Sequence, residues 1–391
     1  MEAYLDNAAT TRAFDEVGAL VARVMCEDYG NPSSLHAKGV EAERYVREAA
    51  DIIAGTLKTA RKNIIFTSGG TESNNMAIIG GCLANRRRGR HMITTCFEHA
   101  SVQQPCLYLE QNFGYEITFL PVDPMGHVDV DELRGALRDD TVLVSVMMVN
   151  NEVGAVLDVE EIGKTVKQFN KDILFHVDAI QAYGKRKINP KRAKIDLLSA
   201  SGHKFHGPKG VGFLYAADGV RMHPYIHGGG QQQGRRSGTD NVPGIAGLGL
   251  AVKRMYDDHE KTVERLYSLK EYAWQLFHTL DDDGGVHIHA CDPERIRETA
   301  PHILSVGIEG VRSEVLLHAL EERGVFVSSG SACSSNHPGI SSTLKAIGVN
   351  EKLLDSTIRI SWSVLTEQAE LDYAAAQIRE LLPVLRKYRR K

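Results

Sequence analysis

The sequence has few cysteines, and none of them are closely paired. Six cysteines are scattered among 391 residues, and no two of them form a Cys-x-x-Cys motif. Metal sites and redox centres normally need closely spaced ligands, and a disulfide scaffold needs a far higher density of cysteine. We therefore expect no metal site, and the cysteine content favours a reducing, cytoplasmic compartment.

The sequence also lacks long hydrophobic runs and an excess of charge of one sign. No apolar stretch approaches the roughly 20 residues that a membrane-spanning helix needs, and the first residues, MEAYLDNAATT, do not resemble a secretion signal. Lys and Arg together number 46 and Asp and Glu number 50, so the net charge is -4. We expect neither a membrane nor a nucleic acid as a partner.

Short apolar runs alternate with helical stretches between about residues 60 and 260. Some of these runs, such as VLVSVMMV and ILFHV, are almost continuously apolar, which is typical of strands buried on both faces of a parallel sheet. The alternation predicts an α/β fold with a mostly parallel sheet and helices on both faces. The expected strands are 63–68, 91–96, 116–121, 141–150, 173–178, 196–200 and 211–215.

The pattern changes after about residue 255. A long charged helix is expected over residues 252–280, and the acidic turn DDDGG follows it. Strands at 302–308, 325–328 and 357–362 and helices at 313–323 and the C-terminus then predict a smaller α+β unit. We expect a large α/β domain over residues 15–255 and a small α+β domain from residues 1–14 and 256–391.

Residues 63–75, NIIFTSGGTESNN, place a glycine turn between a predicted strand and a helix. Glycine lets the backbone approach an anion closely, and a helix N-terminus offers unpaired N–H groups. Gly70 and the hydroxyl of Thr71 are therefore candidate phosphate ligands. The loop differs from the phosphate loop of nucleotide-binding enzymes because no Gly-Lys-Ser/Thr follows. The alternative is an ordinary turn in which Thr71 caps the helix.

Asp178 stands at the end of an apolar strand, where α/β sheets place their ligands. A buried carboxylate is unfavourable unless it meets a cation or an N–H donor, and a protonated pyridine nitrogen would be such a partner. Gln181 lies one helical turn further on. The alternative is that Asp178 caps the next helix.

Lys204 follows another buried strand and lies among small and polar residues in SASGHKFHG. A partly desolvated lysine has a lowered pKa and can form a Schiff base, while Ser201 and His203 offer donors to a phosphate. The alternative is a lysine on an exposed loop. A phosphate site, an acid for a ring nitrogen and a Schiff-base lysine together indicate an enzyme that uses pyridoxal 5'-phosphate (PLP).

These motifs resemble the cysteine desulfurases of the NifS/IscS type, within the class V aminotransferase superfamily of fold-type I PLP enzymes. The matching segments occur in the family's order and span nearly the whole chain. They are YLDNAATT (4–11), NPSSLH (31–36), TSGGTESNN (67–75), EHASV (98–102), NNEVGAV (150–156), HVDAIQAYGK (176–185), SGHKFHGPKGVG (201–212), GGGQQQGRRSGTDNV (228–242), SSGSACSS (328–335) and IRISWS (358–363).

The resemblance implies which residues surround the cofactor ring. Lys204 would carry PLP and move protons during the reaction, and Asp178 would hold the proton on the ring nitrogen. Gln181 would contact the phenolic oxygen. His99 would stack on the ring and act as an acid or base, and Asn151 would lie beside the cofactor and the substrate.

The resemblance also implies a phosphate site and a dimer. Gly70, Thr71, Ser201 and His203 would bind the phosphate within one subunit. Thr239, in RRSGTDN, would reach the same phosphate from the partner subunit, so the protein would be a homodimer with shared sites. The substrate carboxylate would be bound by a further residue, Arg359, through a two-pronged ion pair.

Cys333 distinguishes this group from ordinary aminotransferases. It lies in SSGSACSSNHPGISS, a run of small and turn-forming residues whose composition predicts a mobile, exposed loop at about 328–342. By the resemblance, Cys333 would take the sulfur of L-cysteine as a persulfide, release L-alanine and pass the sulfur to an acceptor protein such as an iron–sulfur cluster scaffold.

Two other classes of function remain possible for these motifs. The first is another enzyme on the same scaffold, either a selenocysteine lyase or a different class V aminotransferase. The second is a catalytically silent homologue that acts as a scaffold. The presence of Lys204, Asp178 and Cys333 argues against the second class.

Overall fold

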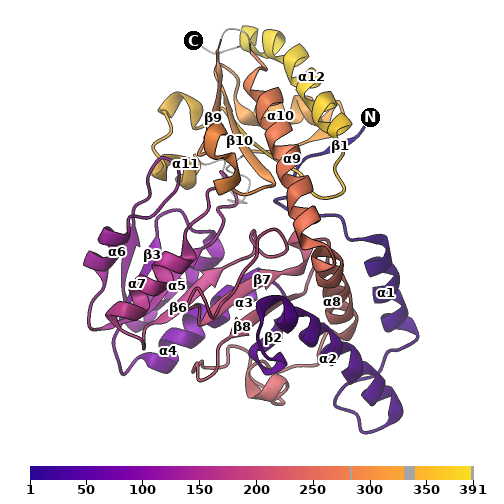
Figure 1. The fold of residues 1–391 in the computed structure, drawn as a ribbon, viewed down its shortest axis with the longest axis vertical. Coiled ribbons are helices and arrows are strands. Elements are labelled where there is room, and N and C mark those ends of the chain that lie inside the picture. Colours follow the sequence, from indigo (N-terminus) through magenta and orange to yellow (C-terminus); the bar gives the residue numbers. More distant parts are fainter. Residues whose placement is uncertain (282–283, 330–339, 389–391) are drawn as a thin grey trace.

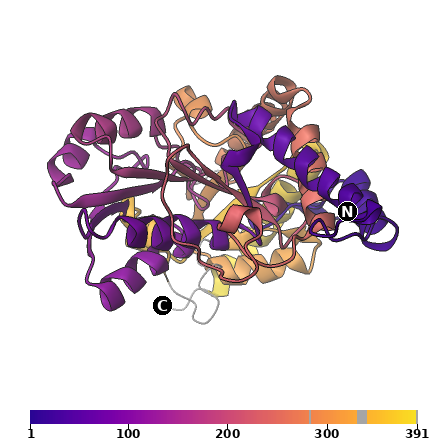
Figure 2. The same ribbon diagram turned by 90° about the horizontal axis from the view of Figure 1, so that it is seen from below.

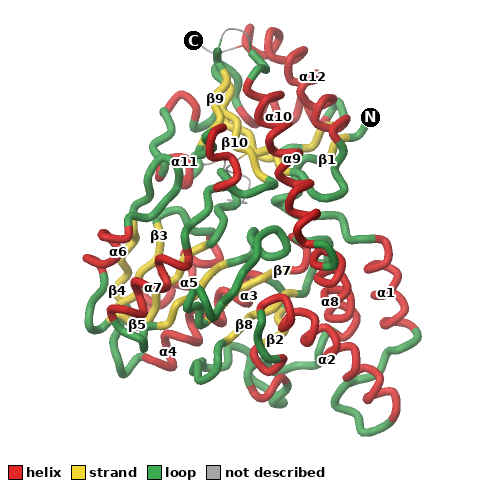
Figure 3. Tube along the Cα trace, in the orientation of Figure 1, coloured by secondary structure: helices red, strands yellow, loops and turns green. Residues whose placement is uncertain are grey.

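The computed structural model describes residues 1–281, 284–329 and 340–388. Its strands form two main sheets, a seven-stranded sheet in the lower part of Figure 1 and a four-stranded sheet in the upper part. Figure 3 shows the two groups of strands in yellow, each with helices around it. The helix α9 (His259–His278) runs from the lower part to the upper part.

The seven-stranded sheet has the order β2-β8-β7-β6-β5-β3-β4. β8 runs antiparallel to both its neighbours, and the other pairs are parallel. The prediction of an α/β fold with a mostly parallel sheet is therefore confirmed. The strands are β2 (Ile64–Thr67), β3 (His91–Thr95), β4 (Glu116–Leu120), β5 (Thr141–Met147), β6 (Leu174–Asp178), β7 (Leu197–Ser201) and β8 (Gly212–Ala216).

Helices flank this sheet along its length. In Figures 1 and 2 the helices α1 and α2 lie at one end of the molecule and α6 and α7 at the other. α1 and α2 pack on α8. The helices are α1 (Asp15–Cys26), α2 (Ala37–Leu57), α3 (Gly70–Asn75), α4 (Gly81–Asn85), α5 (Ala100–Phe113), α6 (Val130–Ala136), α7 (Val159–Phe169) and α8 (Val242–Tyr256).

The four-stranded sheet is antiparallel in the order β12-β13-β10-β9. Beside it, β1 (Ala3–Tyr4) pairs with β11 (Val325–Phe326). The N-terminal strand therefore packs with elements from the C-terminal part of the sequence. The remaining elements are β9 (Val286–His289), β10 (Ile303–Ile308), α10 (Ser313–Glu321), β12 (Ser328–Ser329), α11 (Ser342–Ala346), β13 (Thr357–Ser361) and α12 (Gln368–Leu385).

Each sheet has its own hydrophobic core. One core contains Val144, Phe175 and Phe213 from the seven-stranded sheet. A separate core contains Phe277 and Trp362, together with apolar residues of β10 and α12. The apolar runs of the sequence are buried on both faces as predicted: every residue of β5 is buried.

The predicted single helix over 252–280 is wrong in one respect, because the structure has two helices there. α8 ends at Tyr256 and α9 begins at His259. Asp258 has a non-helical backbone, and its side chain accepts a hydrogen bond from the N–H of Lys261. Aspartate at this position caps a new helix, so α8 and α9 are separate helices although both segments have helical periodicity. The strand β9 was not predicted.

Helices long and apolar enough to cross a membrane do not occur among residues 1–281, 284–329 and 340–388.

Candidate active site

The predicted site residues of the seven-stranded sheet follow the carboxyl ends of its strands. β3, β5, β6 and β7 run in one direction. β2 runs in the same direction, because β8 lies between β7 and β2 and is antiparallel to both. The carboxyl ends of parallel strands meet at one edge of a sheet. Asp178 is the last residue of β6. The segments after β2, β3, β5 and β7 carry Gly70, His99, Asn151 and Lys204 respectively.

Asp178 is buried at the end of β6 and is held by neutral donors. The backbone N–H of Ile180 donates to its Oδ1 at 2.9 Å, and the amide of Asn74 donates to its Oδ2 at 2.8 Å. Burial raises the pKa of this carboxyl group, although the two donors and the nearby His99 and Lys204 oppose the shift. A cation against Asp178 would therefore be favourable.

His99 begins α5 and belongs to the same hydrogen-bond network. The backbone N–H of Ser101 donates to His99 Nδ1 at 3.1 Å, so Nδ1 carries no proton and Nε2 does. The amide nitrogen of Asn74 donates to the hydroxyl of Ser101 at 2.9 Å as well as to Asp178. Burial lowers the pKa of His99, which keeps the ring neutral.

The glycine turn after β2 lies against the end of β7. A Cβ on Gly69 would lie 3.5 Å from Ser201 Oγ, and a Cβ on Gly70 would lie 2.2 Å from a methyl group of Ile180. Gly69 has a φ of 148°, which glycine tolerates far better than other residues. The structure therefore brings the predicted phosphate ligands Gly70 and Ser201 together, and Thr71 is exposed beside them.

The N-terminal segment of residues 6–12 lies over the lysine. Lys204 Nζ donates to the carbonyl oxygens of Ala8 at 2.6 Å and Ala9 at 2.7 Å. The backbone of His203 is held by Thr11, whose N–H and hydroxyl both donate to the His203 carbonyl. Burial lowers the pKa of His203 to about 4, so at neutral pH this side chain is uncharged.

Gln181 connects the same segment to the four-stranded sheet. Its Nε2 donates to the Ala8 carbonyl at 2.9 Å, and its Oε1 lies 3.1 Å from Nε2 of His302. His302 directly precedes β10. The Ala8 carbonyl thus receives donors from both Gln181 and Lys204.

Arg359, in the middle of β13, is almost completely buried. Its Nη2 lies 2.7 Å from Asp6 Oδ1, and its Nη1 donates to the carbonyl of Asn151 at 2.9 Å. Among the described residues, its Nε has no hydrogen-bond partner. The backbone of Asn151 therefore lies beside Arg359.

Thr239 and Cys333 are the remaining predicted residues, and the structure describes one of them. Thr239 is exposed in the loop before α8, and Arg236 of that loop forms an ion pair at 2.9 Å with Glu72 of α3. Cys333 lies outside the described residues.

The sequence comparisons agree with this arrangement. The profile of the family described as aminotransferase class-V matches residues 3–374. The chain belongs to this family. It is 41% identical to "Cysteine desulfurase IscS" of Dictyoglomus turgidum over 385 residues, and this aligned region covers 98% of this chain and 95% of the relative. It is 42% identical to "Putative cysteine desulfurase IscS 1" of Bacillus subtilis, over 97% and 98% of the two chains.

Solved structures also match this member of the class-V aminotransferase family. A "NifS-like protein" has a TM-score of 0.91 and 36% identity, over 98% of this chain and all of that one. A structure described as "SspA in complex with cysteine" has a TM-score of 0.77 and 32% identity, over 93% and 100% of the two chains. The resemblance to NifS/IscS-type cysteine desulfurases is confirmed, and PLP is the cofactor of this family.

The residues at the carboxyl edge of the sheet fit PLP. The buried Asp178 has a raised pKa and would gain a positive partner from a protonated ring nitrogen. Among the described residues, Oδ1 of the buried Asn74 has no partner. The glycine turn after β2 lies against Ser201, and a Cβ on Gly70 would clash with Ile180. An acid, a lysine and a phosphate-sized turn on one sheet edge form a donor set that matches the cofactor.

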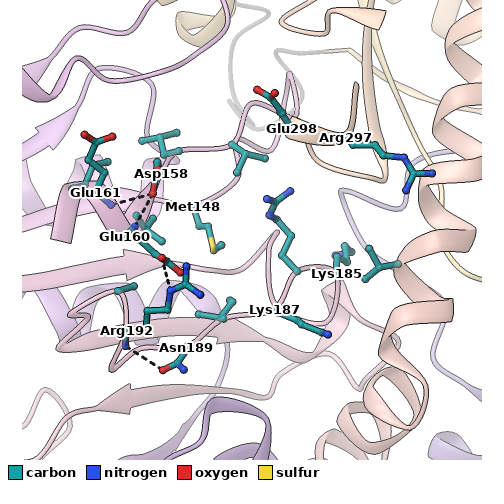
Figure 4. Close-up of a pocket in the computed structure, with 18 of the residues that line it drawn as sticks. Met148, Asp158, Glu160, Glu161, Lys185, Lys187, Asn189, Arg192, Arg297 and Glu298 are labelled. Atoms are coloured by element: carbon teal, nitrogen blue, oxygen red, sulfur yellow. Dashed lines mark hydrogen bonds and ion pairs between the residues drawn. The ribbon is translucent and has the colours of Figure 1, made fainter. Parts of the chain in front are cut away.

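A large cavity lies apart from this site. A cavity of about 970 Å³ is lined by charged residues from α7, α9 and the loop after β6, and none of the predicted site residues lines it (Figure 4). Its charges are largely paired, for example Arg192 with Glu160 at 2.7 Å. A groove of about 620 Å³ contains Thr71 and His99. We therefore place the site by its chemistry and not by cavity size.

Sequence reasoning missed several residues that hold the site residues in place. Asp6 binds Arg359, and His302 binds Gln181. Lys185 is buried, and its Nζ donates to the Lys204 carbonyl at 2.7 Å. Glu152 accepts hydrogen bonds from the hydroxyl groups of Ser341 and Thr343 next to α11. Asp6 and Lys185 do lie in the matched segments 4–11 and 176–185, so a residue-by-residue reading of those segments was the available signal.

Proposed function

We propose that this protein is a PLP-dependent cysteine desulfurase that converts L-cysteine to L-alanine and captures the sulfur as a persulfide on Cys333. The observation that carries the proposal is the convergence on residues 6–9. Lys204 and Gln181 bind the Ala8 carbonyl, and Asp6 binds Arg359. A cofactor-bearing lysine and a carboxylate-binding arginine thus surround one short segment, as the turnover of an α-amino acid requires.

Seven residues would hold the cofactor. Lys204 would carry PLP, Asp178 would hold the proton on the ring nitrogen, and Gln181 would contact the phenolic oxygen. Gly70, Thr71, Ser201 and His203 would hold the phosphate. When bound, PLP supplies an electron-withdrawing ring that stabilises negative charge at the α-carbon of an attached amino acid.

The side chains would bind the substrate and move its protons. Arg359 would bind the carboxylate of L-cysteine, with Asn151 beside it. The Lys204 amine would remove the α-proton and later return a proton, and the Ala8 and Ala9 carbonyls would hold the amine between these steps. His99 would exchange a proton through Nε2, because the Ser101 N–H occupies Nδ1.

Cys333 would perform the sulfur transfer. Its thiolate forms a bond to the substrate sulfur while the bond between that sulfur and Cβ breaks. The bonding electrons stay with the three-carbon fragment, which gains a proton and becomes alanine. The persulfide on Cys333 is then passed to an acceptor protein, such as a scaffold for iron–sulfur clusters.

The proposal includes a domain organisation and an assembly. Residues 15–255 would form a large cofactor-binding domain, and residues 1–14 and 256–391 a small domain that carries the cysteine loop; the separate hydrophobic cores support this division. We propose a cytoplasmic homodimer in which Thr239 reaches the partner's phosphate site.

The decisive experiment measures alanine and sulfide release from L-cysteine with a reductant, for wild type and Cys333→Ser, with the visible spectrum recorded alongside. Bound PLP, both products from the wild type and neither from the variant are expected. Bound PLP without alanine would overturn the proposal. Cleavage of selenocysteine alone would identify a selenocysteine lyase, amino transfer to keto acids would identify an aminotransferase, and a protein that binds no PLP would be a silent scaffold.

A further inference from the structure

His302 is a fully buried histidine that links the two sheets. It directly precedes β10 of the four-stranded sheet and is 0% exposed. Its ring Nε2 lies 3.1 Å from Oε1 of Gln181, which follows β6 of the seven-stranded sheet. Hydrogen bonds matter for a buried polar ring at such a position, because an unpaired donor or acceptor is unfavourable away from water.

The contacts determine which atom donates. The Ala8 carbonyl can only accept, so the Gln181 atom at 2.9 Å from it must be the amide nitrogen. The amide oxygen of Gln181 therefore faces His302, and the Nε2 of His302 must carry the hydrogen that it donates to this oxygen. The contact also makes the opposite amide orientation unfavourable, since two N–H groups would then meet.

The second ring nitrogen carries no proton. Nδ1 of His302 has no hydrogen-bond partner among the described residues. Burial lowers the pKa of this histidine, and the charges of Lys185, Lys270, Arg359 and Lys204 act in the same direction. With these cations around it, the ring stays neutral, and its hydrogen remains on Nε2 throughout the ordinary pH range.

We propose that His302 is a positioning residue that fixes the amide of Gln181 for the cofactor, an inference that rests on the proposed function. The Gln181 amide has two N–H groups. The Ala8 carbonyl takes one of them, and the orientation that His302 imposes leaves the other for the phenolic oxygen of PLP. Without the His302 donor, the amide oxygen loses its partner and the Ala8 carbonyl alone holds the amide, so the hydrogen bond to the phenolic oxygen weakens.

A matched pair of variants tests this role. His302→Asn keeps an N–H donor, and His302→Leu has nearly the same shape without one. We expect His302→Leu to raise the pH midpoint of the visible absorbance change of bound PLP by about half to one unit. A phenolic oxygen without the Gln181 donor is more basic, so it holds the proton that it would share with the Lys204 nitrogen more tightly. His302→Asn should shift the midpoint less. PLP should also leave the Leu variant faster during dialysis.

His91 provides the control, because it is equally buried in β3 and its ring contacts the hydroxyl groups of Thr141 and Thr118. His91→Leu should lower the unfolding temperature and leave the PLP midpoint unchanged. Equal midpoints for wild type and His302→Leu, or equal shifts for the Leu and Asn variants, would overturn the proposal. If His302→Leu does not fold, His302→Ala compared with His302→Asn gives the same contrast. A wild type without a PLP band would instead overturn the proposed function.

Discussion

The two cationic groups of the site are held by different kinds of partner. The lysine side lies at the seven-stranded sheet, where Lys204 donates to the carbonyls of Ala8 and Ala9 and Lys185 donates to the carbonyl of Lys204. Arg359 lies in the four-stranded sheet, where the carboxylate of Asp6 binds it at 2.7 Å. A single N-terminal segment, residues 6–9, supplies partners to both Lys204 and Arg359.

The difference follows from what each group has to do. Carbonyl groups hold an ammonium without a full negative charge, so burial can lower its pKa, and the pKa of Lys185 falls to about 7 for this reason and through repulsion by Lys204. A carboxylate favours the charged form of its partner. The fold thus combines two lysines that donate to carbonyl groups with a guanidinium that binds a carboxylate, and five predictions test this contrast.

The largest effect is expected from Lys204→Ala. The variant removes the group that would carry PLP and move protons, so we expect alanine release to fall by at least about 10³-fold. Borohydride reduction followed by mass measurement should detect PLP attached to the wild type and not to the variant. Lys209→Ala is the control, because Lys209 is an exposed lysine near the same loop. An adduct that persists in Lys204→Ala would assign PLP to another lysine.

Arg359→Gln should affect substrate binding more than the chemical steps. Loss of an ion pair to the substrate carboxylate should raise KM for L-cysteine about 10- to 100-fold, with a smaller change in kcat. Arg359→Lys should recover only part of this loss, since an ammonium cannot bind Asp6, the Asn151 carbonyl and a carboxylate with one planar group. A fall in kcat at constant KM would instead place Arg359 among the proton-transfer groups.

The sequence predicted the parallel layer because strands buried on both faces have a distinctive composition. The predicted strands 91–96 and 173–178 differ from β3 and β6 by one residue at one end. The break between α8 and α9 was missed, because helical periodicity continues through Asp258 and only the cap marks the start of a new helix. β9 is short and half exposed, so it lacks a clear apolar pattern.

For the site, the sequence predicted residues whose role depends on local position, namely those at strand ends such as Asp178 and Lys204. It could not predict pairs between distant segments. Asp6 and Arg359 are 353 residues apart, and Gln181 and His302 are 121 residues apart. A single sequence does not show that such residues are neighbours. The bridge from Asp6 to Ser361 brings the N-terminal segment to Arg359, and the contact of Gln181 with His302 links the two sheets.

Asp6→Asn removes the charge from the partner of Arg359 and keeps an acceptor of the same shape. A neutral acceptor holds a guanidinium less firmly, so we expect KM for L-cysteine to rise about three- to tenfold. In a double-mutant cycle with Arg359→Gln the effects should not add, because both act on one pair. The exposed Asp15, changed to Asn, is the control. Additive effects would show that Asp6 acts independently of Arg359.

Glu152→Gln tests whether the arginine side of the site also affects sulfur transfer. Glu152 follows Asn151 and binds the hydroxyl groups of Ser341 and Thr343, eight and ten residues after Cys333 in the sequence. We expect persulfide formation on Cys333 in a single turnover to slow by about fivefold. Exchange of the α-proton in heavy water should stay near the wild-type rate.

The matched control for Glu152→Gln is Ser342→Ala, which alters an exposed hydroxyl between the two bound ones. This variant should leave both rates near those of the wild type. If α-proton exchange and persulfide formation fall together in Glu152→Gln, Glu152 acts on the cofactor side of the site and not on the segment after Cys333.

Lys185→Met is expected to have the smallest effect, and it concerns stability. The pKa of Lys185 is about 7 in the folded protein and about 10.4 in an unfolded chain. Between these values the unfolded chain binds a proton that the folded protein does not, so the contribution of Lys185 to stability becomes more favourable as pH rises. Below pH 7 both states carry the proton, and the unfavourable contribution is constant.

The variant removes this pH dependence and also leaves the Lys204 carbonyl without its donor, which costs about 1–3 kcal/mol at every pH. The difference in unfolding temperature between Lys185→Met and wild type should therefore favour the variant most at pH 7 and shift towards the wild type by pH 9. Parallel curves would mean that Lys185 keeps its proton in the folded protein. Carbonyl partners would then hold a buried ammonium as firmly charged as Asp6 holds Arg359, and the contrast between the two sides of the site would fail.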